Sequence, residues 1–204
     1  YKLLILPVQQ IIDENLAIRL RKFASSGGTI LFTFRSGIKD RNNNLWLAKP
    51  LPGHLTDLIG AELRDTESLQ SDQDCRINGS GALSGVSGLG KVWRDFLELK
   101  GATPIAIYED PFCGELVGGT YHAYDQGHVF YLGTGADPDF MKKLTLELTA
   151  KSGIPVLESP AGLEVVSRLD QDGRGCRFVL NHTADTVSFD GRTYGPYQSE
   201  IERI

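Results

Sequence analysis

The sequence predicts an α/β domain built on a parallel sheet, followed by a small antiparallel β domain. Apolar runs at 2–6 and 29–34 are typical of buried strands, and residues 14–24 between them have the apolar spacing of an amphipathic helix. Two strands separated by one helix form a βαβ unit, which requires the strands to be parallel. After Pro160 only short alternating segments follow, a pattern that indicates antiparallel strands.

Two longer helices carry start and stop signals. The first begins after Asp13, a preferred N-cap residue, and ends at the glycine pair 27–28. The second begins at 137–138, where an aspartate precedes a proline at the first helical position, and stops at Gly153 and Pro155. The predicted buried stripes are Leu16, Leu20 and Phe23 in the first helix and Phe140, Leu144 and Leu148 in the second.

Between these helices the pattern favours antiparallel strands. Segments 92–99 and 104–108 alternate between apolar and polar residues, and 118–123 with 128–133 forms the clearest hairpin. The run NGSGALSGVSGLG at 78–90 is rich in glycine and serine, so we expect a flexible surface loop or a short linker there.

Composition argues against several classes of function. A net charge of −5 and a pI near 5.4 speak against nucleic acid as a partner, because phosphate binding needs a basic surface. No apolar run approaches the ~20 residues of a membrane helix. Cys75, Cys113 and Cys176 are scattered and the four histidines are isolated, so we predict no metal site and no cofactor. Unpaired cysteines also predict reduced thiols and a cytoplasmic location.

The organisation of the chain predicts a fragment with two domains. Tyr1 leads directly into an apolar strand and the only methionine is Met141, so we expect a longer parent polypeptide. We place a first domain at 1–159, truncated at its N-terminus, and a second at 160–204. Folded alone, the first domain would expose a sheet edge and an apolar face. The second is too small to bury a core reliably and should dock on something larger.

The loop from Arg35 to Pro52 is the strongest candidate for an interface. Long connections without secondary structure are usually functional or interfacial. We single out Arg35, Asp40, Asn43 and Trp46, because arginine and tryptophan are enriched at the energetic centres of interfaces. The alternative is that the loop folds onto its own domain, with Trp46 as a plug.

No catalytic residue is predicted. Ser36 follows the strand at 29–34 but lacks the flanking glycines of a nucleophile elbow. Glu109-Asp110 is expected to be a solvated turn, and Cys113 a semi-buried loop cysteine. The alternative is a hydrolase with an unrecognised nucleophile, for which Ser36 and Cys113 are the candidates.

Six segments in one order resemble a known family. They are GGTILFTFRSGIKDRNNNLW, VWRDFLELKGATPIAIYED, QGHVFYLGTGADPDF, GLEVVSRLD, FVLNHT and GPY. Together they resemble the C-terminal half of the glycoside hydrolase family 42 β-galactosidases, over essentially all of residues 1–204. The resemblance implies a class I glutamine amidotransferase-like (flavodoxin-like) oligomerisation domain that follows a catalytic (β/α)8 barrel, and then a small antiparallel β domain.

This resemblance implies a function without catalysis for the chain itself. Both family catalytic glutamates belong to the barrel, so neither has a counterpart here. In amidotransferase-like sheets a nucleophilic cysteine occupies the corner where this chain has Arg35-Ser36. The implied role is to assemble a β-galactosidase, which hydrolyses terminal β-D-galactosides with retention, as a homotrimer. Its partners would be other copies of itself and the missing barrel.

A third function is a carbohydrate-binding module built on the C-terminal β segments. Such a module needs exposed aromatic side chains on a flat sheet face. The segments offer only Phe178, Phe189, Tyr194 and Tyr197, and some of these must belong to a core.

Overall fold

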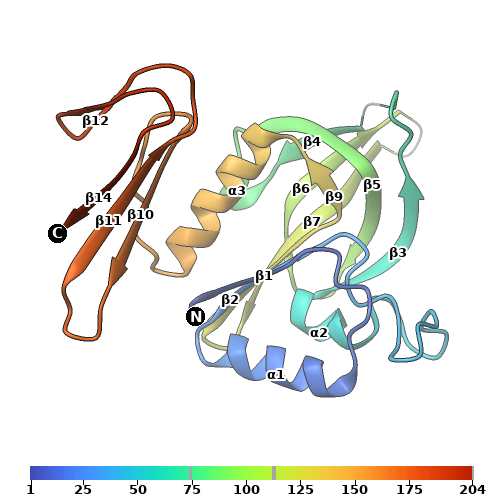
Figure 1. The fold of residues 1–204 in the computed structure, drawn as a ribbon. Helices are drawn as coiled ribbons and strands as arrows, with labels where there is room; N and C mark the ends of the chain where they lie inside the picture. The colour runs from blue at the N-terminus through green and yellow to red at the C-terminus, as the bar shows by residue number, and fades with distance from the viewer. Residues whose placement is uncertain (74, 112–113, 204) are drawn as a thin grey trace. The chain divides into compact units, whose positions relative to one another are not determined.

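The computed structural model describes residues 1–73, 75–111 and 114–203, and it divides the chain into two compact units. Unit 1 is Tyr1–Pro155 and unit 2 is Val156–Ile204. This division and the proposed domain boundary at 159–160 both fall in the irregular segment 154–160. Figure 1 shows the elements of both units.

Unit 1 contains three α-helices and two short 3-10 turns among its described residues. The helices are α1 (Glu14–Ser25), α2 (Thr56–Ile59) and α3 (Pro138–Lys151), and the turns are η1 (Gly53–Leu55) and η2 (Gly81–Leu83). The strands are β1 (Leu3–Leu6), β2 (Thr29–Thr33), β3 (Ala61–Ser68), β4 (Cys75–Gly79), β5 (Ser87–Leu99), β6 (Thr103–Asp110), β7 (Gly114–Tyr124), β8 (Gly127–Leu132) and β9 (Thr134–Ala136).

The strands of unit 1 form one nine-stranded sheet, in which the prediction of a parallel sheet is only partly correct. The order is β1-β2-β8-β7-β6-β4-β5-β3, with β9 paired to β5. β1, β2 and β8 are parallel, and the other pairs are antiparallel. The reason is the connections: α1 provides the crossover between β1 and β2, whereas β3 to β8 follow one another without a crossover helix.

Helices cover both faces of the parallel part of the sheet (Figure 1). Ile30 and Phe32 of β2 join the buried residues of α1 and α2 in one core cluster, whereas Leu31 joins those of α3 in another. This alternation follows from the period of two in a strand, so an apolar run is buried on both faces. The core therefore has three layers around β2 and β8.

The predicted helix starts are confirmed. Asp13 accepts a hydrogen bond from the N–H of Leu16 at 2.8 Å, and Asp137 accepts one from the N–H of Phe140 at 3.0 Å. The predicted stripe of α3 is fully buried. In α1 only Leu20 of the predicted stripe is fully buried, because small residues of the same helix lie closest to the sheet. The buried residues of α1 are Ala17, Leu20 and Ala24.

The prediction of a flexible surface loop or a short linker at 78–90 is wrong. β4 ends and β5 begins inside this run, and Leu83 between them is completely buried. A Cβ at Gly79 would collide with the carbonyl oxygen of Leu83. Glycine is therefore needed here for close backbone approach rather than for flexibility, and composition alone does not separate these two uses.

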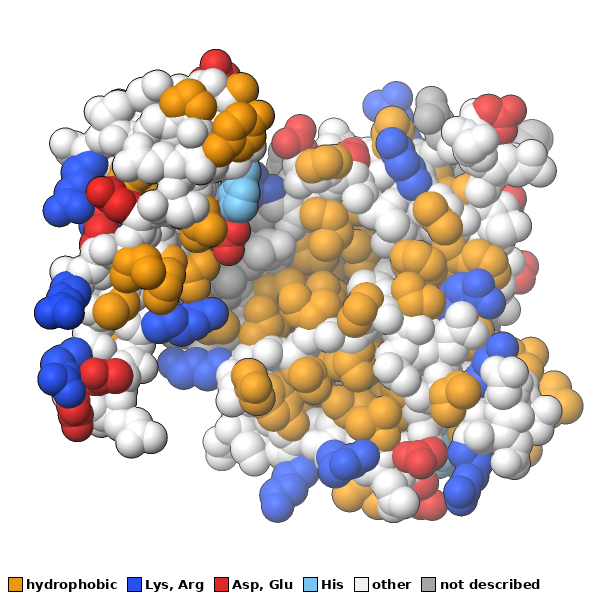
Figure 2. Space-filling model, in the orientation of Figure 1, with side chains coloured by type: hydrophobic (Ala, Val, Ile, Leu, Met, Phe, Trp, Pro, Cys, Tyr) orange, Lys and Arg blue, Asp and Glu red, His pale blue; other side chains and the backbone are white. Residues whose placement is uncertain are grey.

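β1 forms one end of the nine-stranded sheet. Ile5 in β1 is half exposed, and Figure 2 shows hydrophobic side chains gathered over this part of unit 1. An exposed sheet edge and apolar surface were expected for this domain folded alone. Among the described residues, no helix combines the length and the apolar character needed to span a bilayer.

Unit 2 is antiparallel, as predicted. Its sheet has the order β10-β11-β14, and a separate hairpin pairs β12 with β13. The strands are β10 (Leu163–Leu169), β11 (Gly175–Asn181), β12 (Val187–Phe189), β13 (Arg192–Tyr194) and β14 (Ser199–Arg203). Its buried apolar cluster consists of Leu163, Val179 and Tyr194, with three half-buried residues packed against it.

Candidate functional site

The loop after β2 is ordered by backbone pairing with the segment that follows β1. Ile11 forms a parallel bridge with Lys39, and Lys39 forms an antiparallel bridge with Leu45. The N–H of Trp46 also donates to the carbonyl of Ile38 at 3.2 Å. This loop is therefore a small three-segment structure rather than an unstructured connection.

Asp40 and Asn43 shape the turn at the tip of this loop. The Asp40 carboxylate accepts hydrogen bonds from the backbone N–H groups of Asn42 and Asn44, both at 2.9 Å. Asn43 has φ of 66°, a left-handed conformation that asparagine tolerates well, and it accepts a hydrogen bond from Lys39 Nζ at 3.0 Å. The Asp40 side chain thus fixes the backbone of the turn, and Asn43 supplies its left-handed residue.

Trp46 packs against its own domain at the base of the loop. Its ring meets the His54 ring edge-on at 4.9 Å between centroids, and Lys49 Nζ lies 5.1 Å from the indole centroid. A Cβ at Gly53 would collide with the indole, whose Nε1 is buried without a hydrogen-bond partner among the described residues. These contacts favour the plug that the sequence left as an alternative. Burial and the nearby Lys49 charge lower the pKa of His54.

Two leucines beside Trp46 are exposed, and residue-level reasoning from the sequence missed them. Leu45 is 49% exposed and Leu47 is 91% exposed, while Ile11 in the adjoining bridge is 38% exposed. We call Ile11, Leu45 and Leu47 the loop patch; Figure 2 shows hydrophobic side chains at this projecting loop. The available signal was two leucines on either side of a tryptophan, directly after the polar run 39–44.

Arg35 belongs to a different cluster, at the carboxyl end of β2. Its φ of 62° is left-handed, and its backbone N–H donates to Asp95 Oδ2 at 3.0 Å. The guanidinium carbon lies 4.5 Å from the ring centroid of Trp93. The structure thus brings Asp40, Asn43 and Trp46 together in one loop and places Arg35 with residues of β5.

Asp95 is the fully buried carboxylate of this second cluster. It accepts hydrogen bonds from Trp93 Nε1 and Tyr131 Oη, both at 2.6 Å, as well as from the N–H of Arg35. Burial raises the pKa of Asp95, and the hydrogen bond from Tyr131 opposes that rise most strongly. We call Arg35, Trp93, Asp95 and Tyr131 the corner.

Asp95 was also missed at the level of sequence. The signal was available, because Asp95 alternates with Trp93 and Leu97 along one strand, so it occupies an inward position. A carboxylate at such a position needs hydrogen-bond donors around it. One such donor is the indole of Trp93, which lies two residues away and therefore on the same side of the strand.

The nucleophile candidates are not arranged for catalysis in the described part of the chain. Ser36 Oγ is buried and has no hydrogen-bond partner among the described residues, and His122 Nδ1 is within hydrogen-bond distance of the Leu58 carbonyl at 2.9 Å. Cys113 lies outside the described residues. Within 1–73, 75–111 and 114–203, no group of three histidine, cysteine, aspartate or glutamate side chains is placed to hold a metal ion.

The prediction of a solvated turn at Glu109-Asp110 is wrong. β6 continues through both residues because Asp110 is paired with Gly114 of β7. The Asp110 side chain is only 8% exposed and forms an ion pair with Arg94 at 3.1 Å. The proline after Asp110 indicated where the strand ends, and the two residues before that proline belong to the strand.

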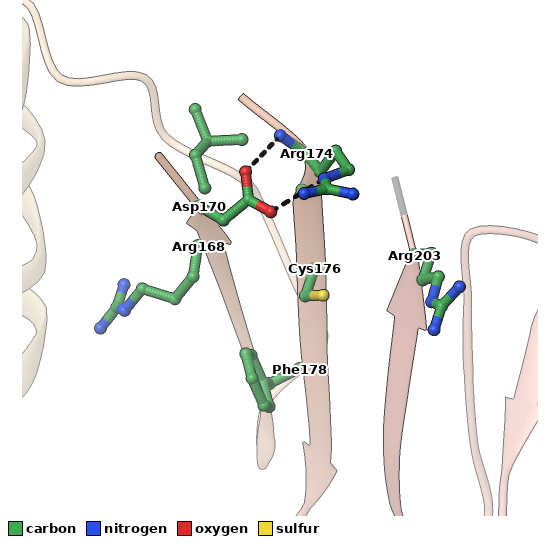
Figure 3. A pocket seen from close by; sticks show the side chains of 8 residues that line it. Arg168, Asp170, Arg174, Cys176, Phe178 and Arg203 are labelled. Carbon is green, nitrogen blue, oxygen red and sulfur yellow. Dashed lines mark hydrogen bonds and ion pairs between the residues drawn. The ribbon is translucent and has the colours of Figure 1, made fainter. Parts of the chain in front are cut away.

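Unit 2 has an open hollow of about 600 Å³ on one face of its sheet. Figure 3 shows Arg168, Cys176 and Arg203 side by side on three neighbouring strands, with Phe178 beyond them. Of the aromatic residues considered for sugar binding, Tyr194 is buried and Phe189 packs against the core, which leaves Phe178 and the exposed Tyr197. This is too few for a flat aromatic platform.

Comparison with known proteins agrees with this picture. Residues 1–155 match the family described as the β-galactosidase trimerisation domain. The β-galactosidase BgaA of Planococcus sp. (strain 'SOS Orange') is 30% identical over 194 residues, which cover 93% of this chain and 28% of that protein.

Solved structures give the same result. The crystal structure of the β-galactosidase from Bacillus circulans sp. alkalophilus matches 98% of this chain, and 32% of its own length, with a TM-score of 0.91 and 26% identity. Gan42B, a GH42 β-galactosidase from G. stearothermophilus, matches all of this chain and 32% of its own, with a TM-score of 0.86 and 25% identity. The chain thus spans under a third of each of these proteins. It belongs to the family of β-galactosidase trimerisation domains of glycoside hydrolase family 42.

Proposed function

We propose that this chain is a non-catalytic module that assembles a parent β-galactosidase into a homotrimer. The parent would hydrolyse terminal β-D-galactosides with retention, and its catalytic barrel would be the second partner of the chain. The observation that carries the proposal is the loop patch, three exposed apolar side chains held by the backbone bridges of Lys39 in a member of a trimerisation-domain family.

The physical argument rests on exposed apolar area. Leu47 leaves 91% of its surface in water, and burying a leucine side chain contributes about 1.5–3 kcal/mol. Clustered apolar side chains on an ordered surface mark interaction sites more often than isolated ones do. In a closed ring of three, the loop patch of each copy would contact a different surface of the next copy. The same contact would therefore occur three times in the ring.

The four interface candidates take separate roles in this proposal. Asp40 and Asn43 hold the turn that presents the loop patch, and Trp46 anchors the base of the loop. Arg35 offers a separate polar contact at the end of β2. These roles are supported by the hydrogen bonds and ring contacts of each residue.

We also propose the finer classification and location of the chain. Three parallel strands with helices on both faces support an amidotransferase-like class for a domain of residues 1–159, with Arg35-Ser36 in place of the nucleophile. The following domain, 160–204, is the small β domain. Free thiols at Cys75 and Cys176 support a cytoplasmic location.

Two measurements test the proposal. The purified chain should not hydrolyse nitrophenyl β-D-galactoside above the buffer rate, and hydrolysis that co-purifies with the chain would contradict the non-catalytic role. The substitution Trp46→Ala should weaken self-association, because the loop patch loses its anchor. Unchanged assembly of that variant would remove Trp46 from the interface.

A further inference from the structure

Among the described residues, Arg35 is the half-buried arginine of unit 1 whose guanidinium forms no ion pair, although its charge interacts with that of the nearby Asp95. Arg21 and Arg94, the other half-buried arginines of this unit, each pair with a carboxylate, at 2.7 Å to Asp57 and 3.1 Å to Asp110. Among the described residues, no carboxylate lies within ion-pair distance of the Arg35 guanidinium, and its Nε is buried without a hydrogen-bond partner. A partly desolvated cation without an ion pair is stabilised when a carboxylate of another molecule binds it.

The guanidinium of Arg35 is also held in place before any partner arrives. Asp95 accepts the hydrogen bond of the Arg35 N–H and so fixes a backbone with φ of 62°. The same carboxylate accepts the indole N–H of Trp93 at 2.6 Å, which fixes the ring that lies 4.5 Å from the guanidinium carbon. A preorganised planar guanidinium loses little conformational freedom when it binds a carboxylate in a two-point geometry.

We propose that Arg35 receives a carboxylate from a second copy of this chain, and that Asp95 is the positioning residue for this contact. The inference rests on the proposed assembly function and adds the chemistry of one contact to it. Asp95 acts through its hydrogen bonds to the Arg35 backbone and to the Trp93 indole, and it does not touch the partner.

Charge complementarity favours a second copy as the source of the carboxylate. Each chain carries 26 acidic against 21 basic side chains, so copies repel one another unless cations are placed at their contacts. In a ring of three, the surface that faces the corner differs from the corner itself, so the Arg35 of one copy does not meet the Arg35 of the next.

The test compares trimer dissociation by sedimentation velocity at low and high salt for the full chain and its variants. Arg35→Gln should weaken association by roughly tenfold or more at low salt and flatten its salt dependence. Glutamine at φ of 62° is as strained as arginine, so the backbone cost is matched. Arg19→Gln, which removes an exposed arginine of α1, is the control and should leave association within about threefold.

Asp95→Asn tests the positioning role with a readout that a structural role alone would not move. It should reduce the salt dependence of association as Arg35→Gln does. The double variant Arg35→Gln/Asp95→Asn should associate no more weakly than either single variant. Additive effects of the two substitutions would overturn the positioning role. If Asp95→Asn fails to fold, Trp93→Leu, which removes the ring under the guanidinium, takes its place in the same cycle.

The outcomes separate this inference from the proposed function. A trimeric chain whose Arg35→Gln variant associates normally overturns the carboxylate contact and leaves the assembly role intact. A chain that stays monomeric at every concentration overturns the assembly role itself, and the inference with it.

Discussion

The loop patch and the corner are two surface regions of unit 1 that differ in polarity, in exposure and in the contacts that hold them. The loop patch is apolar and mostly in water, and it is held by backbone bridges and the Asp40 turn. The corner is polar and partly desolvated, and its geometry depends on one buried carboxylate. The difference teaches that separate regions can determine how tightly and in which orientation a partner binds. Burial of apolar area contributes to the affinity, and a charge held in place determines the orientation.

Removing the carboxylate of the corner should have the largest effect on stability. Asp95→Ala leaves three donors without an acceptor, one of them fully buried and two half-buried, which we expect to lower the free energy of unfolding by about 3–5 kcal/mol. Urea denaturation followed by tryptophan fluorescence measures this, because Trp46 and Trp93 both lie in unit 1. Asp72→Ala, at an exposed position, is the control. Equal stability of the two variants would show that the hydrogen bonds of Asp95 do not stabilise the fold.

Placing a charge in the loop patch should weaken self-association and leave the stability of the monomer unchanged. Leu47→Glu should weaken self-association by roughly tenfold or more while the unfolding midpoint stays nearly constant, because the leucine makes its contacts outside the monomer. The control is Leu146→Glu in α3, a leucine that is 40% exposed. If both variants assemble equally well, the loop patch is not the interface.

Weakening one hydrogen bond of the corner should give a smaller loss. Trp93→Phe keeps a ring beneath Arg35 but removes the indole donor, so we expect a loss of about 1.5–3 kcal/mol for a hydrogen bond to a carboxylate. Fluorescence of the remaining Trp46 in a urea titration reports the unfolding. A value well below 1 kcal/mol would indicate that water replaces the indole.

The smallest expected effect is on pH dependence. Burial raises the pKa of Asp95 in the folded state above its unfolded value, although the donors of the corner oppose the rise. The native state then binds the proton more tightly, so this stabilising contribution is complete below the unfolded pKa of ~3.9 and is lost as pH rises through the folded pKa. The stability of the wild type minus that of Asp95→Asn should therefore fall as pH rises from ~4 to ~7. A difference that rises with pH would show that the hydrogen bonds outweigh desolvation.

The local structure of this chain could be predicted from local signals. Asp13 and Asp137 cap their helices because the cap is a contact within one turn. The hairpin of β7 and β8 was readable for the same reason. The parallel pair of β1 and β2 could also be predicted, because one helix joins them. The extension of the parallel part to β8 could not, since β2 and β8 are distant in sequence.

The candidate site was only half predictable. Arg35 and Trp46 drew notice by residue type, but the contacts that separate them into two clusters join β2 to β5 and the loop to the segment after β1. Asp95 looked like an ordinary polar residue of an alternating strand. Two of its three donors, Arg35 just after β2 and Tyr131 of β8, are brought beside it only by the folded sheet.

The mass of the unaltered chain in solution tests the central claim most directly. Sedimentation across a wide range of concentrations should reveal a species of three times 22.4 kDa that dissociates on dilution. A chain that sediments at 22.4 kDa at every concentration would contradict the account, because neither the loop patch nor the corner would then join copies of this protein.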